Sequence, residues 1–181
     1  MNVGKKFEKC FKDSIPDFCL KYRLKDPPQA QNHTINSTFS WDNPCDFFMF
    51  DTRNRELWCL ELKSTKQKYM SFEDINSNSP KKKTIKKHQI LDLAKFGKFD
   101  YVNAGFIINF RDEEKGVERS YYQNINDFMH MCANISKTSF NEIDLIMNGA
   151  IKINGELLRV NYRWDICKLI SDVTDKKYGN K

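Results

Sequence analysis

The sequence predicts an α/β domain in which a mixed central β-sheet is flanked by helices. An amphipathic helical segment opens the chain, and short apolar strands then alternate with helical segments. Residues 56–63 alternate too little for a surface strand, which indicates a strand covered on both faces, and 102–110 have the composition of a second buried strand. With 181 residues, 40% of them hydrophobic, the chain is long enough to bury one sizeable core, and it shows no internal repeat or linker.

Local signals place the elements. The first helix has Phe7, Cys10 and Phe11 on one face, while lysines occupy the others and Pro16 ends it. A polar loop with two prolines follows over 24–38. Helices are expected over 3–14, 84–96, 125–135, 140–148 and 165–173. Strands are expected over 38–42, 45–51, 56–63, 102–110 and 118–123.

The C-terminal part has two further signals. The dipeptide Asn154-Gly155 predicts the turn of a hairpin over 151–163. Asp165 is the expected N-cap of the last helix. We therefore expect a single domain over 1–181, with a core over about 2–135, a C-terminal hairpin and helix packed on it over 136–175, and a frayed end over 176–181.

Composition narrows the possible partners. Lys and Arg number 30 against 24 Asp and Glu, a net charge of +6 that is compatible with a polyanionic partner. No apolar run approaches the ~20 residues needed to cross a bilayer, and the first residues lack the apolar region of a secretory signal, so we expect a cytoplasmic protein without membrane contact. The six cysteines are scattered without a Cys-x-x-Cys pair, which argues against zinc and favours reduced thiols, four of them among apolar neighbours: Cys10, Cys45, Cys59 and Cys167.

Three polar residues stand out within this apolar background. Asp46 opens one strand, and Glu61 and Lys63 lie on one face of the next. If the two strands pair as a hairpin, all three side chains meet at one end of the sheet. The alternative interpretations are an exposed strand end or a turn cap for Asp46, and a surface ion pair between Glu61 and Lys63.

The residue types suit metal-assisted hydrolysis. Mg²⁺ prefers oxygen ligands, takes few of them from protein and keeps several waters. A bound metal lowers the pKa of such a water, and a nearby lysine stabilises charge on a phosphate. Gln89, at the start of a helix, is a further source of a neutral oxygen.

A lysine-rich stretch lies between this pattern and the helix at 84–96. Beside a metal-nuclease pattern these lysines are candidates for contacts with DNA phosphates, although such runs are commonly solvated loops. The candidate DNA-binding residues are Lys81, Lys82, Lys83, Lys86 and Lys87.

These features together resemble the PD-(D/E)XK nuclease superfamily, with Pro44-Cys45-Asp46 as the first half of the motif and Glu61-Leu62-Lys63 as the second. More narrowly, the chain is similar to RecU-type Holliday junction resolvases and their phage relatives. The further matching segments are 2–8, Ser71-Phe72, Lys87-His88-Gln89 and 104–110. Cys45 stands where bacterial members carry Thr.

The resemblance implies a restriction-endonuclease-like core and a homodimer that binds four-way DNA junctions. It implies symmetric cutting with Mg²⁺, for which Mn²⁺ can substitute, leaving 5′-phosphate ends in DNA recombination, repair or phage DNA processing. Asp46, Glu61, Gln89 and Glu8 would be metal ligands, and Lys63 would stabilise the transition state.

Other functions stay open on the sequence alone. A restriction-like enzyme that cuts duplex DNA would carry the same residues. A DNA-binding protein that keeps the fold without catalysis, or an interaction module with a coincidental Asp and Glu-x-Lys, are the remaining alternatives.

Overall fold

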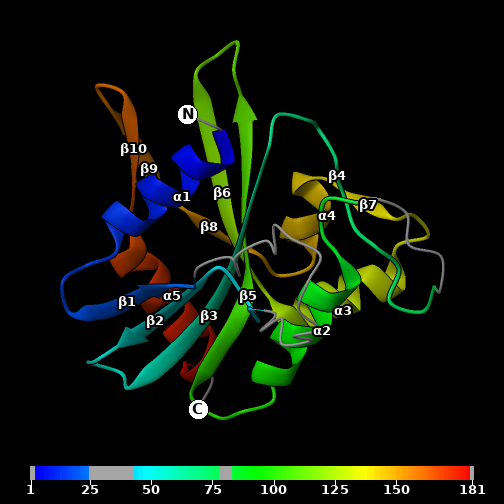
Figure 1. Cartoon of the computed structure of the whole chain (residues 1–181), viewed down its shortest axis with the longest axis horizontal. Coiled ribbons are helices and arrows are strands. Elements are labelled where there is room, and N and C mark those ends of the chain that lie inside the picture. Colours follow the sequence, from blue (N-terminus) through cyan, green and yellow to red (C-terminus); the bar gives the residue numbers. More distant parts are fainter. Residues whose placement is uncertain (1–2, 25–42, 78–82, 180–181) are drawn as a thin grey trace, which may run out of the picture.

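The computed structural model describes residues 3–24, 43–77 and 83–179. Within these ranges the chain forms five helices and ten strands (Figure 1). Their order is α1 (Val3–Ser14), β1 (Cys19–Arg23), β2 (Phe47–Asp51), β3 (Glu56–Thr65), β4 (Met70–Ser71), α2 (Lys87–Phe96), β5 (Val102–Asp112), β6 (Val117–Asn124), α3 (Ile125–Asn134), β7 (Ser139–Phe140), α4 (Glu142–Met147), β8 (Ile151–Ile153), β9 (Gly155–Leu158), β10 (Asn161–Trp164) and α5 (Ile166–Tyr178).

The predicted mixed sheet is confirmed. Six strands lie in the order β1-β2-β3-β5-β6-β8. The pair β3–β5 is parallel, because α2 lies in the crossover between these strands, and the other neighbours are antiparallel. The pairs β4–β7 and β9–β10 form two small separate sheets.

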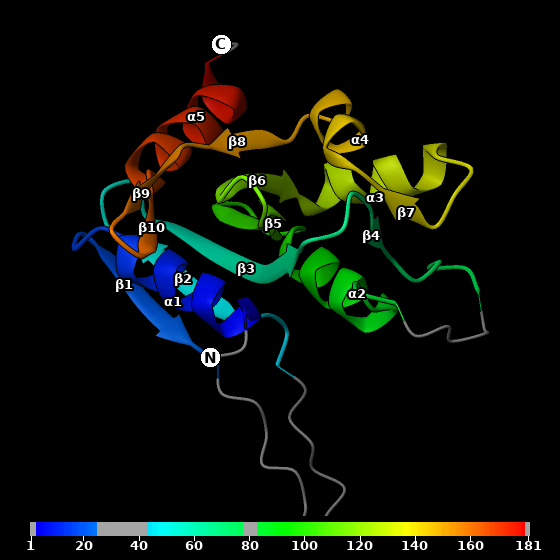
Figure 2. The same ribbon diagram turned by 90° about the horizontal axis from the view of Figure 1, so that it is seen from above.

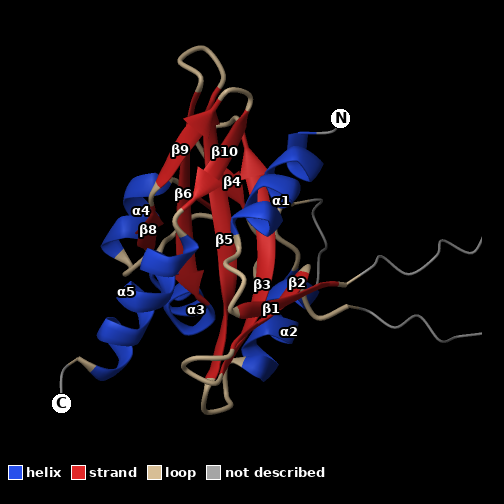
Figure 3. Ribbon diagram, turned by 90° about the vertical axis from the view of Figure 1, so that its left-hand side faces the viewer, coloured by secondary structure: helices blue, strands red, loops and turns tan. Residues whose placement is uncertain are grey.

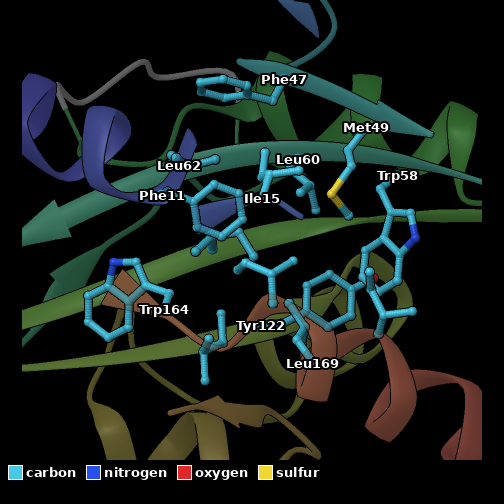
Figure 4. Packing of buried hydrophobic residues seen from close by; sticks show 14 of the residues in the cluster. Phe11, Ile15, Phe47, Met49, Trp58, Leu60, Leu62, Tyr122, Trp164 and Leu169 are labelled. Atoms are coloured by element: carbon cyan, nitrogen blue, oxygen red, sulfur yellow. The ribbon is translucent and has the colours of Figure 1, made fainter. Parts of the chain in front are cut away.

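Helices cover both faces of the main sheet, as Figures 2 and 3 show. Helices α1 and α5 pack on one face, where Phe11, Trp58, Leu60 and Leu169 share a core (Figure 4). Helices α2, α3 and α4 pack on the other face in a second core cluster. The central strand β3 is therefore buried on both sides, and any polar side chain on it needs a partner.

The C-terminal segment completes the first of these cores. Trp164 of β10 lies edge-on to Phe7 of α1, with ring centroids 6.0 Å apart. Its backbone N–H donates to the Ser14 hydroxyl at 2.9 Å, and that hydroxyl donates to the Cys10 carbonyl at 2.7 Å. Strand β10 is thus an integral part of the packing around α1.

The predicted hairpin at Asn154-Gly155 is wrong. β8 pairs with β6, and the hairpin is β9–β10, which turns at residues 159–160, where Arg159 has φ 28°. Gly155 is required for another reason: a Cβ there would lie 2.3 Å from the Trp164 ring. The dipeptide accordingly marks a close approach of the backbone to a large ring.

The predicted starts of the first and last helices agree with the structure. α1 has the predicted limits, and the Asp165 side chain accepts from the Lys168 N–H as an N-cap. α5 extends beyond its predicted end, so 176–178 are helical, because Lys177 and Tyr178 both donate to the buried Glu56 carboxylate. β1 was not predicted, and the expected strand at 38–42 lies outside the described residues.

The structure also tests the membrane and cysteine predictions. In the described ranges, no helix is both long and apolar enough to span a membrane. All six cysteines are free, and Cys10, Cys45 and Cys59 are buried as expected. Cys167 is exposed, which corrects its predicted burial, because it points outward from the first turn of α5.

Replacing Trp164 is expected to destabilise the protein strongly if the C-terminal hairpin belongs to the core. Trp164→Ala should lower the free energy of unfolding by about 3–5 kcal/mol, the usual cost of truncating a buried aromatic side chain. Leu157→Ala on the exposed part of the same hairpin should change it by less than about 0.5 kcal/mol. Urea unfolding measures both, and equal small effects would contradict this packing.

Candidate active site

The antiparallel pair β2–β3 brings the first two candidate residues together. Phe47 lies opposite Leu60, so Asp46, just before β2, faces the Glu61 segment of β3. The Asp46 N–H donates to the Leu60 carbonyl at 3.1 Å, and the Asp46 carboxylate accepts from the Leu62 N–H at 2.7 Å. The expected pairing of the two strands is confirmed, and it holds the Asp46 carboxylate against the β3 backbone.

Glu61 and Lys63 project from the face of β3 that α2 covers. Side chains two residues apart on a strand share a face, and Lys63 Nζ lies 2.9 Å from Glu61 Oε1. The side chains of Glu61 and Lys63 are only 6% and 17% exposed. The ion pair that the alternative interpretation expected is present, but it is buried rather than spread on an open sheet surface.

Helix α2 supplies the next partner of Glu61. Gln89 Nε2 donates to Glu61 Oε1, the same oxygen that Lys63 contacts. The Gln89 amide oxygen accepts from the Lys86 N–H at 3.0 Å, within the capping box of α2. Gln89 therefore reaches the site as predicted, but it presents its amide nitrogen, and a ligand role for its oxygen would require the side chain to rotate and give up the cap.

Glu73 is a residue that the sequence analysis missed. Its carboxylate accepts from the Lys87 N–H at 2.8 Å, at the first residue of α2. Its own N–H donates to the Ile85 carbonyl at 2.9 Å, next to a parallel bridge between Phe72 and Ile85. These contacts join Glu73 to residues at the end of the lysine-rich stretch, 12 and 14 positions further along the chain. No local pattern could therefore have identified the residue. They set the position of α2 and hence of Gln89.

Burial raises the pKa of Glu61 to about 7 from its ordinary value of 4.5. Loss of hydration is the largest cause; the Lys63 ammonium opposes it without cancelling it, and the Asp46 carboxylate adds to the increase. Glu61 consequently changes its protonation state near neutral pH. A cation beside it would favour the ionised form.

Glu8 does not join the two carboxylates in a three-acid cluster. Its carboxylate lies 2.7 Å from Arg23, the last residue of β1, in an ion pair. In the part of the chain that the structure describes, no three His, Cys, Asp or Glu side chains are grouped closely enough to hold a metal ion. A ligand role for Glu8 stays a prediction, and it would require exchange of Arg23 for the metal.

Cys45 is buried beneath the site. A hydrogen bond with Cys59, followed by loss of hydration, raises the pKa of the Cys45 thiol. The thiol also contacts the Phe47 carbonyl at 3.2 Å. Cys45 is thus a protonated packing residue, and neither a nucleophile nor an ionised ligand.

The candidate DNA-binding lysines lie near the start of α2. Lys81 and Lys82 are outside the described residues. Lys83 donates to the Thr138 hydroxyl at 3.2 Å, and the Lys87 ammonium contacts the Ser77 carbonyl at 3.5 Å. Lys86 is exposed and is the N-cap of α2, and Lys87 is the first residue of the helical turn that carries Gln89.

Comparison with known proteins connects the chain to a prophage protein. The chain is similar to the SPbeta prophage-derived uncharacterized protein YotM of Bacillus subtilis (strain 168), with 34% identity over 131 residues. The aligned residues make up 71% of this chain and 58% of that protein. The chain therefore spans less than two thirds of the length of this relative. No protein-family model matches the chain.

The raised pKa of Glu61 predicts a pH-dependent stability in the presence of a chelator. Between about pH 4.5 and 7 the folded protein holds the Glu61 proton that the unfolded chain has lost, so the free energy of unfolding decreases as the pH rises. Relative to Glu61→Gln, wild type should lose on the order of 3 kcal/mol across this interval. Urea unfolding of both proteins at several pH values measures the difference, and parallel pH profiles would contradict the raised pKa.

Proposed function

We propose that this protein is a Mg²⁺-dependent, structure-selective DNA endonuclease that resolves Holliday junctions by symmetric paired nicks. The observation that carries the proposal is the buried contact of Glu61 with Lys63 and Gln89, with Asp46 facing it from β2. Burying a carboxylate costs free energy that a purely structural strand would avoid with an apolar residue. A carboxylate with a raised pKa and a specific charge partner is typical of a functional site.

The donor set fits a hard divalent cation. Asp46 and Glu61 would hold the ion through carboxylate oxygens, and the remaining positions would be filled by water, as Mg²⁺ prefers. Mn²⁺ accepts the same ligands and would substitute. When bound, such an ion lowers the pKa of a coordinated water and neutralises charge on the phosphate.

The residues of the chain have separate roles in this proposal. Lys63 would donate to a non-bridging oxygen of the scissile phosphate as negative charge develops there. Glu61 would position the Lys63 ammonium, and Gln89 would hold the Glu61 carboxylate through the same oxygen. In the hydrolysis, the water oxygen would bond to phosphorus as the bond to the 3′ oxygen breaks. The proton that the water gives up to solvent balances the proton that the 3′ oxygen takes from solvent, which leaves 5′-phosphate and 3′-hydroxyl ends.

The substrate and assembly are inferred from the resemblance to RecU-type resolvases. A four-way junction has approximate two-fold symmetry, so paired cuts on opposing strands call for two active sites in a homodimer. The similarity to a prophage-derived protein supports a role in phage DNA processing or recombination. The proposed phosphate contacts are the lysines that precede and open α2, namely Lys81, Lys82, Lys83, Lys86 and Lys87.

Cleavage of a labelled four-way junction with Mg²⁺ tests the site. Glu61→Gln should abolish cutting while it retains binding, and Lys63→Met should reduce the rate by at least about 10²-fold, as expected for loss of a group that stabilises the transition state. Asp92→Asn, which removes the partner of Lys95 on α2, is a matched control and should cut like wild type. Equal cutting by wild type and Glu61→Gln would refute the assignment.

Competition between substrates separates the related functions. A junction should compete for the wild-type protein at least about tenfold better than a linear duplex of equal length, since junction selectivity corresponds to about 1.4 kcal/mol or more. Preferential cutting of the duplex would instead indicate a restriction-like enzyme. Tight junction binding without any cutting in Mg²⁺ or Mn²⁺ would indicate a DNA-binding protein without catalytic activity.

Metal binding can be tested without an activity assay. At about pH 8, millimolar Mg²⁺ should raise the thermal midpoint of wild type, because binding to the folded state adds stability by mass action. The shift should be smaller for Glu61→Gln and for Asp46→Asn, each of which removes one charged ligand. Equal shifts for all three proteins would place the Mg²⁺ elsewhere.

A further inference from the structure

Helix α1 presents a stripe of lysines to solvent. Lys5, Lys9 and Lys12 are exposed and have the spacing of neighbours on one helix face. Phe7 and Phe11 on the opposite face are buried in the core. Among the residues that the structure describes, none of the three lysine side chains takes part in an ion pair with a carboxylate.

Many lysines elsewhere in the described chain are paired with carboxylates. Besides Lys63 of the candidate site, seven of them lie within 4.0 Å of an Asp or Glu oxygen, namely Lys66, Lys95, Lys115, Lys137, Lys168, Lys176 and Lys177. The lysines close to the candidate site differ from these. Within the described ranges, Lys83, Lys86 and Lys87 at the start of α2 lack a carboxylate partner, like the lysines of the α1 stripe. Within the described ranges, the lysines without a carboxylate partner are thus most numerous on α1 and at the start of α2, whereas Lys21, Lys68, Lys98 and Lys152 stand singly elsewhere. Three arginines also lack such a partner there, namely Arg55, Arg159 and Arg163.

The α1 stripe flanks the site on the side opposite to α2. Glu8 of α1 is bound to Arg23, which lies opposite Phe47 in the β1–β2 register, next to Asp46. The Leu24 N–H donates to the Asp46 carbonyl at 2.9 Å, so this corner of the sheet joins α1 to the site. In Figure 2, α1 and α2 lie on either side of β3.

The end of the stripe carries additional positive charge. Lys21 of β1 donates to the carbonyls of Lys12 and Ile15 at 3.0 and 3.3 Å, at the C-terminal end of α1. The exposed Asp13 forms no ion pair with a residue of the described part. The surface therefore keeps a net positive charge along its whole length.

These features select the class of ligand. A row of unpaired cations binds a polyanion, and a stripe of about 10 Å corresponds to about three base pairs of duplex DNA. A basic amphipathic helix can also bind a membrane surface, but it does so by inserting its apolar face. In α1 that face is already buried against β3 and β10, so DNA is the better match.

We propose that Lys5, Lys9 and Lys12 of α1 form a second DNA-contact surface, which binds the phosphate backbone of one duplex arm. The start of α2 would bind backbone on the other side of the site, so the substrate is held from both helices. The choice of DNA as the polyanion rests on the proposed nuclease function.

Binding of the full-length protein to a labelled four-way junction tests this surface. We would use the Glu61→Gln background without Mg²⁺, so that cutting does not interfere, and measure fluorescence anisotropy over a range of NaCl concentrations. Replacing Lys5, Lys9 and Lys12 by Gln should weaken binding at least about tenfold and reduce the slope of log K against log salt by about 3, or about 1 per lost phosphate contact.

Two matched variants separate a local contact from general electrostatics. The triple Gln variant of Lys95, Lys115 and Lys168 makes the same change in net charge at exposed, ion-paired lysines, and it should bind within about twofold of the parent. The triple Arg variant of Lys5, Lys9 and Lys12 keeps the charge and should bind like the parent. Equal thermal midpoints are expected for the two Gln variants, and Lys9→Gln alone should give about one third of the slope change.

The outcomes discriminate between this inference and the proposed function. If the Glu61→Gln parent binds no DNA, the proposed nuclease function fails. If the parent binds and the α1 Gln variant behaves like its control, only the α1 surface is refuted. Weak binding by the Arg variant, or lysine-dependent binding to phosphatidylserine vesicles with DNA binding unchanged, would likewise overturn it.

Discussion

The burial of the Glu61 carboxylate is the constraint on which the rest of the site depends. β3 lies between two helical layers, so a charged side chain on it loses most of its hydration. Such a group persists only with a cation and hydrogen-bond donors at hand. Lys63 comes from the same strand, but Gln89 comes from α2, and α2 can deliver it only because Glu73 and the Phe72–Ile85 bridge hold the helix start in place.

The two faces of the main sheet differ in role: one is covered by an apolar core, and the other carries the candidate site. On one face, α1, α5 and the C-terminal hairpin enclose an apolar core around Trp58, Phe11 and Trp164. This packing also fixes α1, whose outer face carries the unpaired lysines. On the other face, the second core leaves a polar edge where Asp46 and the Glu61–Lys63 pair meet. The apolar core on the α1 and α5 face thus supports the polar site on the opposite face of the sheet.

Local sequence patterns predicted the elements well where the signal is local. The amphipathic period of α1, the capping aspartate of α5 and the apolar runs of β3 and β5 all match the structure. The hairpin predicted at Asn154-Gly155 was wrong because a glycine is also needed where the backbone comes close to another group. Here the backbone of Gly155 lies against the Trp164 ring. β1 was missed because its exposed residues, Leu20 to Arg23, show no clear alternation and become a strand only by pairing with β2.

The sequence by itself determined which residues share a face and which strands can pair, since both follow from the two-residue period of a strand and the turn between β2 and β3. It therefore predicted that Asp46, Glu61 and Lys63 would lie close together, with Gln89 near them by resemblance. Only the tertiary structure decided what each side chain does there. It turned the Gln89 amide nitrogen toward Glu61, paired Glu8 with Arg23 and raised the pKa of Glu61. It also left Lys5, Lys9 and Lys12 of α1 without a carboxylate partner among the described residues. These outcomes depend on partners from distant segments and on competition among them for the same charges and hydrogen bonds.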